Sequence, residues 1–476
     1  RRNRRRRILK WTAGTGALVM VAGCGGAYYL YRHFNSNLTS VKVQLGDETE
    51  RPPAAGDALN VLVLGTDSRQ GLGREYGDEG SAGHADTTLL FHIAKDRSNA
   101  TVISIPRDLM VPIPDCQGPD GKRIPGSARD MFNNSLGQEG RDPGCTWKTV
   151  EKATGIRVDH FVQVDFEAVK TLSTAVGGVE VCAAKDIDDK DSHLKMAKGR
   201  HVVQGDEALA FVRTRHAVGL GGDLTRIPLQ QQFISSMIRK IKSDDTLTSP
   251  TKLYKLADAA TKALTVDSGI GSVEKLKDLA LDISKVDTKN ITFATVPVLD
   301  DPKDENRLVL KQPDAGQLFS MIATDRSLTG TATPPPADGT AATAAPAATT
   351  PAVAAEDVRV TVRNGSGTRG RSGPTVEKLK AGGFARAAVG SDAPAAATTT
   401  VSYPAGQEAA AAALAAALGL PADAARPNPK AGPNDPLLLV LGKDAAAAPA
   451  NPAAAATEAP KDLQRVQADD TDVCAK

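Results

Sequence analysis

Short apolar runs rich in β-branched residues recur between residues 57 and 325, and they alternate with segments of helical periodicity. Each strand-like run is bounded by turn-forming or charged residues, which is typical of strands buried in a sheet. The predicted strands are residues 61–64, 87–94, 101–105, 161–164, 179–182 and 291–296. The predicted helices are residues 166–176, 205–213, 227–241 and 253–264. This alternation predicts one α/β domain over 57–325, with a mixed central sheet covered by helices.

The pattern is lost near residue 329. Residues 331–355 are almost entirely Ala, Thr, Pro and Gly, with no aromatic residue and too little apolar bulk for a core. The segment 326–355 is therefore predicted to be a disordered, semi-extended linker. Because few contacts are expected across such a linker, the first domain is predicted to fold without anything that follows Ala355.

A second, weaker pattern follows the linker. Alternating, helical and apolar segments occur at residues 358–362, 375–381 and 437–441. They predict a small C-terminal α/β domain over 356–445. Residues 446–476 lack such a pattern and are predicted to be a disordered tail.

The N-terminus combines a basic cluster with an uncharged run. Six arginines and one lysine lie within residues 1–10, and residues 11–31 carry no charge. As a helix that run would measure about 30 Å, the thickness of a bilayer core. Basic flanks stay cytoplasmic, so residues 1–10 are predicted to be a cytoplasmic tail, 11–31 a transmembrane helix and 32–56 an external stalk.

A cleaved signal peptide is the alternative for this segment, because Val21-Ala22-Gly23-Cys24 is similar to a lipoprotein cleavage box. Whether Cys24 carries a lipid is left open.

The formal net charge is +2, less than that of the N-terminal cluster alone. The exported part is therefore near neutral, which argues against a nucleic-acid binder. The five cysteines include no CxxC pair, so a structural zinc site is not expected. In an oxidising exterior, Cys116 and Cys145 are predicted to form a disulfide across a Pro/Gly-rich stretch. The pairing of Cys182 and Cys474 is left open.

Charged residues gather at the predicted strand ends. Asp67 and Arg69 follow the first strand, Asp86 precedes the second, and Arg107-Asp108 follows the third. Ligand sites of open α/β sheets lie at the carboxyl ends of strands. A further charged group follows the helix at 205–213 and consists of Arg213, Arg215, Asp223, Arg226 and Gln230.

These residue types suit phosphoryl chemistry. Arginines bind phosphate oxygens in a bidentate manner, and Asp67 and Asp86 offer the hard oxygen ligands that Mg²⁺ prefers. A metal and arginine clamp spreads the charge that develops during phosphoryl transfer. No Walker loop supports a nucleotide substrate, and no HExxH, GxSxG or Cys/His nucleophile motif is present. Taken singly, each charged pair is also compatible with a local ion pair.

The order of the motifs resembles that of the LytR-CpsA-Psr family. The similar segments are residues 65–69, 85–87, 104–108, 158–166, 177–179 and 211–215. Residues 360–367 are similar to the LytR C-terminal domain of actinobacterial members.

The resemblance implies a single-pass membrane enzyme of the bacterial envelope, with its catalytic domain outside the cell. Such an enzyme is a phosphotransferase that moves an anionic glycopolymer from a polyprenyl diphosphate carrier to peptidoglycan. Transfer forms a phosphodiester and releases polyprenyl phosphate. The implied cofactor is Mg²⁺ or Mn²⁺.

By the same resemblance, Asp67 and Asp86 hold the metal, and Asp108 and Asp223 orient arginines or act as base. The implied diphosphate ligands are Arg69, Arg107, Arg213, Arg215, Arg226 and Gln230. The chain departs from the family pattern at His84, Met131 and Leu229, where many relatives carry basic residues.

Two other functions are compatible with the sequence. A polyprenyl diphosphate-glycan pyrophosphatase would use the same residues with water as acceptor. A non-catalytic envelope-binding or regulatory protein is favoured by the second domain, which shows no acid/base set.

Overall fold

In the computed structural model the chain forms two compact units. The first contains residues 1–330 and 458–476, and the second contains residues 331–457. The structure describes residues 2–67, 83–118, 120–215, 223–243, 248–329, 355–366, 371–381, 383–418, 420, 424–432, 435–442, 458–471 and 474. Most of the predicted linker, residues 330–354, lies outside the described residues.

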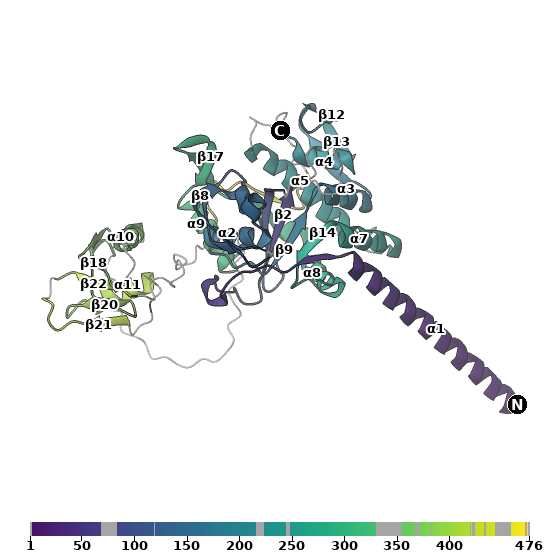
Figure 1. Ribbon diagram of the computed structural model, residues 1–476, viewed down its shortest axis with the longest axis horizontal. Helices are drawn as coiled ribbons and strands as arrows, with labels where there is room; N and C mark the ends of the chain where they lie inside the picture. Colours follow the sequence, from purple (N-terminus) through teal and green to yellow (C-terminus); the bar gives the residue numbers. More distant parts are fainter. Residues whose placement is uncertain are drawn as a thin grey trace. The chain divides into compact units, whose positions relative to one another are not determined.

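An eight-stranded mixed sheet forms the centre of the first unit (Figure 1). In spatial order its strands are β1 (Thr39–Val41), β14 (Leu264–Asp267), β9 (His160–Val164), β2 (Leu59–Thr66), β3 (Ala85–Ile93), β4 (Ala100–Ile105), β15 (Ile291–Thr295) and β23 (Arg465–Gln467). β3 is antiparallel to both β2 and β4, whereas β9 is parallel to β2 and β15 is parallel to β4. The carboxyl ends of β2, β4, β9 and β15 therefore lie at one edge of the sheet.

Helices cover both faces of this sheet. Leu89 and Phe293 pack with Ile234, Ile238 and Ile283, which come from helices on one face. Phe161 in β9 points to the other face, where its ring lies 6.4 Å from that of Trp147 in an edge-to-face arrangement. The strand periodicity of two makes neighbouring residues alternate between these two cores. The fold class predicted from the sequence is confirmed.

The helices of the first unit are α1 (Arg2–Asn37), α2 (Pro143–Thr154), α3 (Phe166–Ala175), α4 (Asp206–Arg213), α5 (Asp223–Lys242), α7 (Pro250–Ala263), α8 (Val273–Lys285) and α9 (Asp314–Ala323). Short two-stranded sheets pair β5 (Met110–Ile113) with β8 (Ser127–Met131), β6 (Cys116–Gln117) with β7 (Arg123–Ile124), β10 (Val179–Ala183) with β13 (Gly199–Val203), β11 (Ile187–Asp189) with β12 (Leu194–Met196), and β16 (Val298–Asp301) with β17 (Asp304–Leu310).

The N-terminal segment departs from its sequence prediction. α1 includes residues 11–31, predicted to span a membrane, but no helix among the described residues is long and apolar enough to cross one. The expected stalk, residues 32–56, is partly built into the domain. β1 pairs with β14 in it, and the side chain of His33 lies 2.8 Å from Asp258. The domain therefore begins before residue 57.

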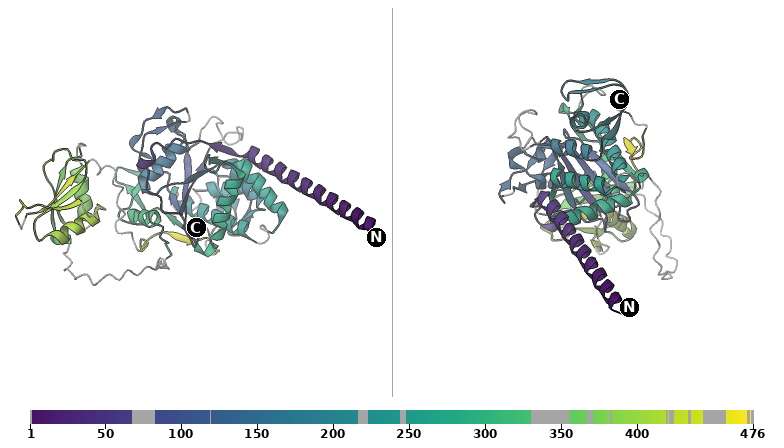
Figure 2. Two further views of the ribbon diagram at one scale, coloured as in Figure 1. Left: turned by 90° about the horizontal axis from the view of Figure 1, so that it is seen from below. Right: turned by 90° about the vertical axis from the view of Figure 1, so that its right-hand side faces the viewer.

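The prediction of a disordered tail is wrong for residues 458–471. β23 pairs with β15, and Ala468 is fully buried in the core beneath the sheet. A disulfide joins Cys474 to Cys182 in β10. The yellow C-terminal segment lies against the first unit in both views of Figure 2. The first unit therefore includes residues after Ala355, and because apolar burial and strand pairing stabilise a fold, these residues should add to its stability.

The one predicted disulfide is confirmed. Cys116 and Cys145 are bonded, with Cα atoms 5.3 Å apart, and both side chains are buried together with Ile124. The stretch between them is less irregular than expected, since Asp142 caps α2 by accepting a hydrogen bond from the Cys145 backbone N–H. Cys24 is exposed and unpaired.

The second unit is a small α/β domain, as predicted. Its five-stranded sheet has the order β19 (Arg386–Val389), β18 (Arg359–Asn364), β22 (Leu437–Leu441), β20 (Thr400–Tyr403) and β21 (Ala425–Pro427). α10 (Ser372–Ala381) and α11 (Glu408–Ala417) supply the rest of a core that includes Val362, Leu379 and Leu414.

The C-terminal attachment yields a stability prediction. Cys474→Ser removes a cross-link between residues 292 positions apart. The unfolded chain gains conformational entropy when a cross-link is lost, and the gain increases with the length of the closed loop. We expect the free energy of unfolding of the first unit to fall by about 3–5 kcal/mol. Urea unfolding followed by the fluorescence of buried Trp147 measures the change.

Cys24→Ser is the matched control, because Cys24 forms no disulfide. Equal unfolding midpoints for Cys474→Ser and the control would contradict the attachment.

Candidate functional site

A β-bulge starts the candidate site. Gly65 pairs with Thr87 and Thr66 pairs with Ala85, so Asp86 is the extra residue of β3. A bulged residue leaves the regular ladder and its side chain is re-aimed. Gly65 makes this close pairing possible, since a Cβ there would lie 2.9 Å from the Cβ of Thr87. Asp86 is thereby set apart at the edge where β2 and β4 end.

Arg107 is the first partner of Asp86. It follows β4, and its Nη1 donates to Asp86 Oδ1 at 2.8 Å. Its Nε lies 3.6 Å from Asp108 Oδ1, so two carboxylates fix the guanidinium. The Arg107 carbonyl in turn accepts a hydrogen bond from the Asn133 backbone N–H. The predicted pair Arg107-Asp108 is therefore part of a larger network rather than an isolated ion pair.

α5 brings two further predicted residues to the same place. Arg226, only 6% exposed, donates from Nη2 to the Asp86 carbonyl. Gln230 lies one turn later and donates from Nε2 to Thr87 Oγ1 at 2.9 Å and to the Val212 carbonyl at 3.4 Å. One face of α5 thus contacts the bulge and the end of α4 together.

The arginine pair lies where α4 ends. As predicted, the helix stops at Arg213 and Thr214 is extended. Thr214 is fully buried and its hydroxyl is 2.7 Å from that of Ser192. The Arg213 guanidinium lies 4.7 Å from the centre of the Phe166 ring, a cation–π contact at the start of α3. Arg215 is held through its backbone N–H, which donates to Asp189.

The backbone of His84 connects Asp67 to Asp86 by two hydrogen bonds. The Asp67 carboxylate accepts a hydrogen bond from the His84 N–H at 2.7 Å, and the His84 carbonyl accepts one from the Asp86 N–H at 2.9 Å. Within the described residues, Oδ2 of neither aspartate takes part in a hydrogen bond. No group of three or more His, Cys, Asp or Glu side chains is arranged for a metal in this part of the chain.

Two aspartate oxygens nevertheless fit a magnesium ion. Mg²⁺ is usually held by one or two carboxylates, with substrate phosphates and waters completing the shell. The predicted ligands Asp67 and Asp86 supply that number. They remain a predicted metal site.

Two predicted site residues lie outside this description. Arg69 is not among the described residues, and α5 begins at Asp223, whose side chain is not described. Conversely, Leu229 is 1% exposed and packs in the apolar core beside Phe233, so it makes no polar contact.

Sequence reasoning missed three supporting residues. Thr87 binds Gln230, Phe166 stacks on Arg213, and the buried Asp189 holds the backbone of Arg215. Thr87 and Phe166 stand inside motifs that the sequence singled out, and only their roles were missed. Asp189 carries no such signal.

The arrangement is suited to an anionic, phosphate-bearing ligand. Arg107, after β4, and Arg226, on α5, meet at Asp86 near the carboxyl ends of parallel strands, where open sheets bind ligands. Arg213 and Arg215 lie at the end of α4, whose Val212 carbonyl is joined to this cluster through Gln230. Burial of Asp165, which caps α3 beside this group, raises the pKa of its carboxyl above the usual range. Asp108 and Asp86 orient Arg107, and the guanidiniums present planar donors to oxygen atoms.

Family comparisons cover both units. The model of the LytR_cpsA_psr family matches residues 28–324, and that of the LytR cell envelope-related transcriptional attenuator matches residues 357–444.

Among curated relatives, the cell wall biosynthesis protein LcpA of Corynebacterium glutamicum is 33% identical over 312 residues, covering 60% of this chain and 58% of the relative. The polyisoprenyl-teichoic acid–peptidoglycan teichoic acid transferase TagT of Bacillus subtilis is 32% identical over 259 residues, covering 51% of this chain and 74% of the relative. The chain thus spans less than two thirds of the Corynebacterium relative's length.

Among solved structures, a LytR-Csp2A-Psr enzyme from Actinomyces oris is 22% identical and superposes with a TM-score of 0.47, covering 60% of this chain and 96% of that one.

The stacking of Arg213 on Phe166 gives a prediction. Phe166→Leu keeps an apolar side chain, though a smaller one, but removes the ring face on which the guanidinium lies. A cation–π contact contributes about 0.5–1 kcal/mol, so we expect the affinity for inorganic pyrophosphate to fall about two- to fivefold. Isothermal titration calorimetry measures it.

Phe166→Tyr retains the ring and is the matched control, expected to bind within about twofold of the parent. Equal affinities for the Leu and Tyr variants would show that the ring does not contribute to pyrophosphate binding.

Proposed function

This chain belongs to the LytR_cpsA_psr family, and we propose that it transfers an anionic glycopolymer from a polyprenyl diphosphate to peptidoglycan. The single observation that carries the proposal is the clustering of Asp86, Arg107 and Arg226 at the carboxyl edge of the sheet. Relatives named as teichoic acid transferases and cell wall biosynthesis proteins support the reaction class.

The proposed reaction exchanges one phosphorus–oxygen bond for another. The acceptor hydroxyl oxygen of peptidoglycan forms a bond to the phosphorus that carries the glycan. The bond from that phosphorus to the bridging oxygen breaks, and polyprenyl phosphate leaves with the electron pair. Arg107, Arg213 and Arg215 bind the diphosphate oxygens and stabilise the charge that builds up on them.

A carboxylate takes the proton of the acceptor hydroxyl. Asp108 and Asp223 are the two candidates, and either can orient an arginine or act as general base. Asp108 already lies 3.6 Å from Arg107 Nε, which supports an orienting role for it. Gln230 and Thr87 fix the position of α5 against β3 while the arginines bind.

Asp67 and Asp86 would hold a divalent metal, Mg²⁺ or Mn²⁺. When bound, the metal supplies positive charge that neutralises the diphosphate. The chain orients the two carboxylates. Asp67 Oδ1 accepts a hydrogen bond from the His84 N–H, and Asp86 Oδ1 accepts one from Arg107.

The assay that tests the function follows polyprenyl phosphate release by the purified full chain. Given metal and a polyprenyl diphosphate glycan, release should depend on added peptidoglycan and be matched by polymer bound to it. Release at the same rate without peptidoglycan would favour the pyrophosphatase. No release in either case would favour a non-catalytic envelope-binding protein.

The arginine pair gives a prediction on rate. Arg213→Lys and Arg215→Lys keep the charge but lose the planar fork that grips two oxygens. A charge-assisted hydrogen bond contributes about 1.5–3 kcal/mol, so transfer should slow by at least about tenfold. Initial rates with one donor measure the effect, and thermal melting checks the fold.

Arg200→Lys is the control, because Arg200 forms a half-exposed ion pair with Glu180 across β10 and β13. Parent-like rates in both test variants would place the pair outside the reaction.

The aspartates give a prediction on metal dependence. Asp67→Asn and Asp86→Asn each remove one anionic ligand, so the Mg²⁺ concentration for half-maximal transfer should rise by about tenfold or more. Metal titration of the transfer rate measures this.

Asp304→Asn, in the exposed β16–β17 hairpin, should leave the metal titration unchanged. Full activity in excess chelator would contradict the metal site.

A further inference from the structure

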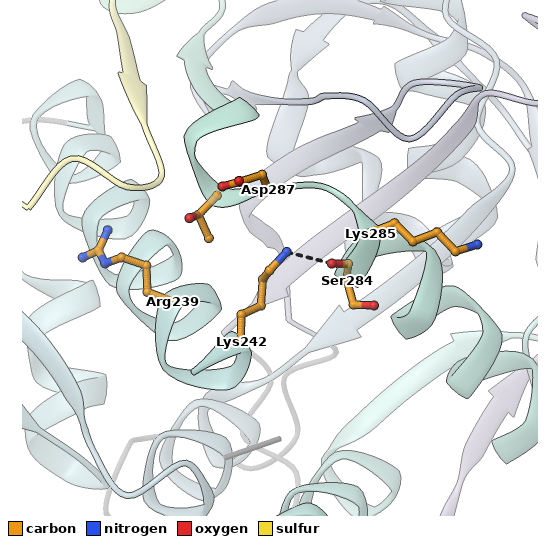
Figure 3. A pocket seen from close by; sticks show the side chains of 6 residues that line it. Arg239, Lys242, Ser284, Lys285 and Asp287 are labelled. Carbon is orange, nitrogen blue, oxygen red and sulfur yellow. Dashed lines mark hydrogen bonds between the residues drawn. The ribbon is translucent and has the colours of Figure 1, made fainter. Parts of the chain in front are cut away.

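A cationic cavity lies at the C-terminal end of α5, away from the candidate site. It has a volume of about 430 Å³ and is lined by Arg239, Lys242, Ser284, Lys285, Asp287 and Thr288 (Figure 3). This volume is within the range of cavities that bind small ligands. Thirteen residues separate Arg226 from Arg239 along the helix, which corresponds to about 20 Å at 1.5 Å per residue. The cavity is therefore distinct from the candidate site.

Two of its three cations lack a carboxylate partner. Lys285 lies 2.7 Å from Asp282, and Asp287 lies 3.4 Å from Lys289, so these two lining residues are each paired elsewhere. Arg239 and Lys242 form no ion pair within the described part of the chain. Arg239 donates to the Ala468 carbonyl and to Ser236 Oγ, whereas Lys242 donates to the carbonyls of Ser284 and Val286.

These two charges are also partly removed from water. Burial lowers the pKa of the Arg239 guanidinium and of the Lys242 ammonium below their usual ranges. Asp287 acts on Lys242 at longer range, and Glu180, Asp469 and Asp470 act on Arg239, but none of them forms an ion pair with these cations within the described residues. A partly buried charge without a direct ion pair is costly, and an anion in the cavity would offset part of that cost. Arg239 and Lys242 are three residues apart on one helix face, so a single anion can contact both.

Helix capping explains only part of this arrangement. Figure 3 shows Lys242 directed to the carbonyl of Ser284, at the end of α8, and cations at a helix C-terminus stabilise it. The hydrogen bonds to the Ser284 and Val286 carbonyls use two of the three ammonium hydrogens. It leaves one hydrogen of Lys242 and further guanidinium hydrogens of Arg239 for a ligand.

We propose that this cavity binds a phosphate group of the polyanionic glycopolymer, about 20 Å from the site of transfer along α5. The polymer as occupant rests on the proposed function; the anion chemistry rests on the cavity alone. Two anchoring points on one rigid helix would hold an extended polyanion in one direction. A membrane surface is the less favoured occupant, because headgroups are bound by exposed basic clusters rather than by partly buried cations.

The first test is direct binding of inorganic phosphate to the full chain by titration calorimetry. Lys242→Gln should raise the dissociation constant at least about fivefold, whereas Lys242→Arg should restore binding to within about twofold. Lys240→Gln, a neighbour on α5 outside the cavity, is the matched control and should bind like the parent. Equal binding by all four proteins would overturn the site.

The second test assigns the occupant. With long polymer donors, Arg239→Gln combined with Lys242→Gln should raise KM about tenfold and affect kcat less, since the contact lies far from the reacting atoms. Unchanged KM with lost sedimentation on phosphatidylglycerol vesicles would overturn the polymer and assign a membrane. If the parent binds phosphate as expected but transfers nothing, the proposed function fails and the cavity assignment stands.

Discussion

The pairing of β2 with β3 is the constraint on which the candidate site depends. Their ladder skips Asp86, so this carboxylate leaves the sheet where Arg107 and the first turns of α5 meet it. The close approach at Gly65 leaves no room for a side chain, since even a Cβ would collide with Thr87. Without the bulge, Asp86 would return to the ladder and the two arginines would lose their common partner.

The same sheet explains the unusual path of the chain. β15 would be an open edge without β23, and exposed edges invite pairing with other chains. The returning segment covers this edge, buries Ala468 and is fastened by the disulfide from Cys474 to Cys182. The second unit is consequently an insertion between α9 and β23 rather than a terminal appendage. The Cys182 backbone N–H also donates to the Gln232 side-chain oxygen, which connects the disulfide to α5.

Strong local patterns made much of this architecture predictable. Apolar runs bounded by turns identified β2, β4 and β15, and the i, i+2 spacing of Arg213 and Arg215 indicated where α4 ends. The Cys116–Cys145 disulfide could be predicted because the two cysteines flank a short loop-like stretch in an oxidising compartment.

Features that depend on distant contacts were not predictable. β1 and β23 have three residues each, too short for a periodic signal, and they become strands only through their partners. The Cys182–Cys474 bond joins residues 292 positions apart, and spacing cannot select such a pairing. The ring of Phe166 over Arg213 likewise arises from the packing of α3 against α4.

The central claim is that the cluster around Asp86 binds the diphosphate of the donor. The most direct measurement is a crystal structure of the full chain with a short-chain polyprenyl diphosphate and Mg²⁺. We expect phosphate oxygens within hydrogen-bonding distance of Arg107, Arg213 and Arg215, at the carboxyl edge of the sheet. A diphosphate bound elsewhere, with no contact to these arginines, would contradict it.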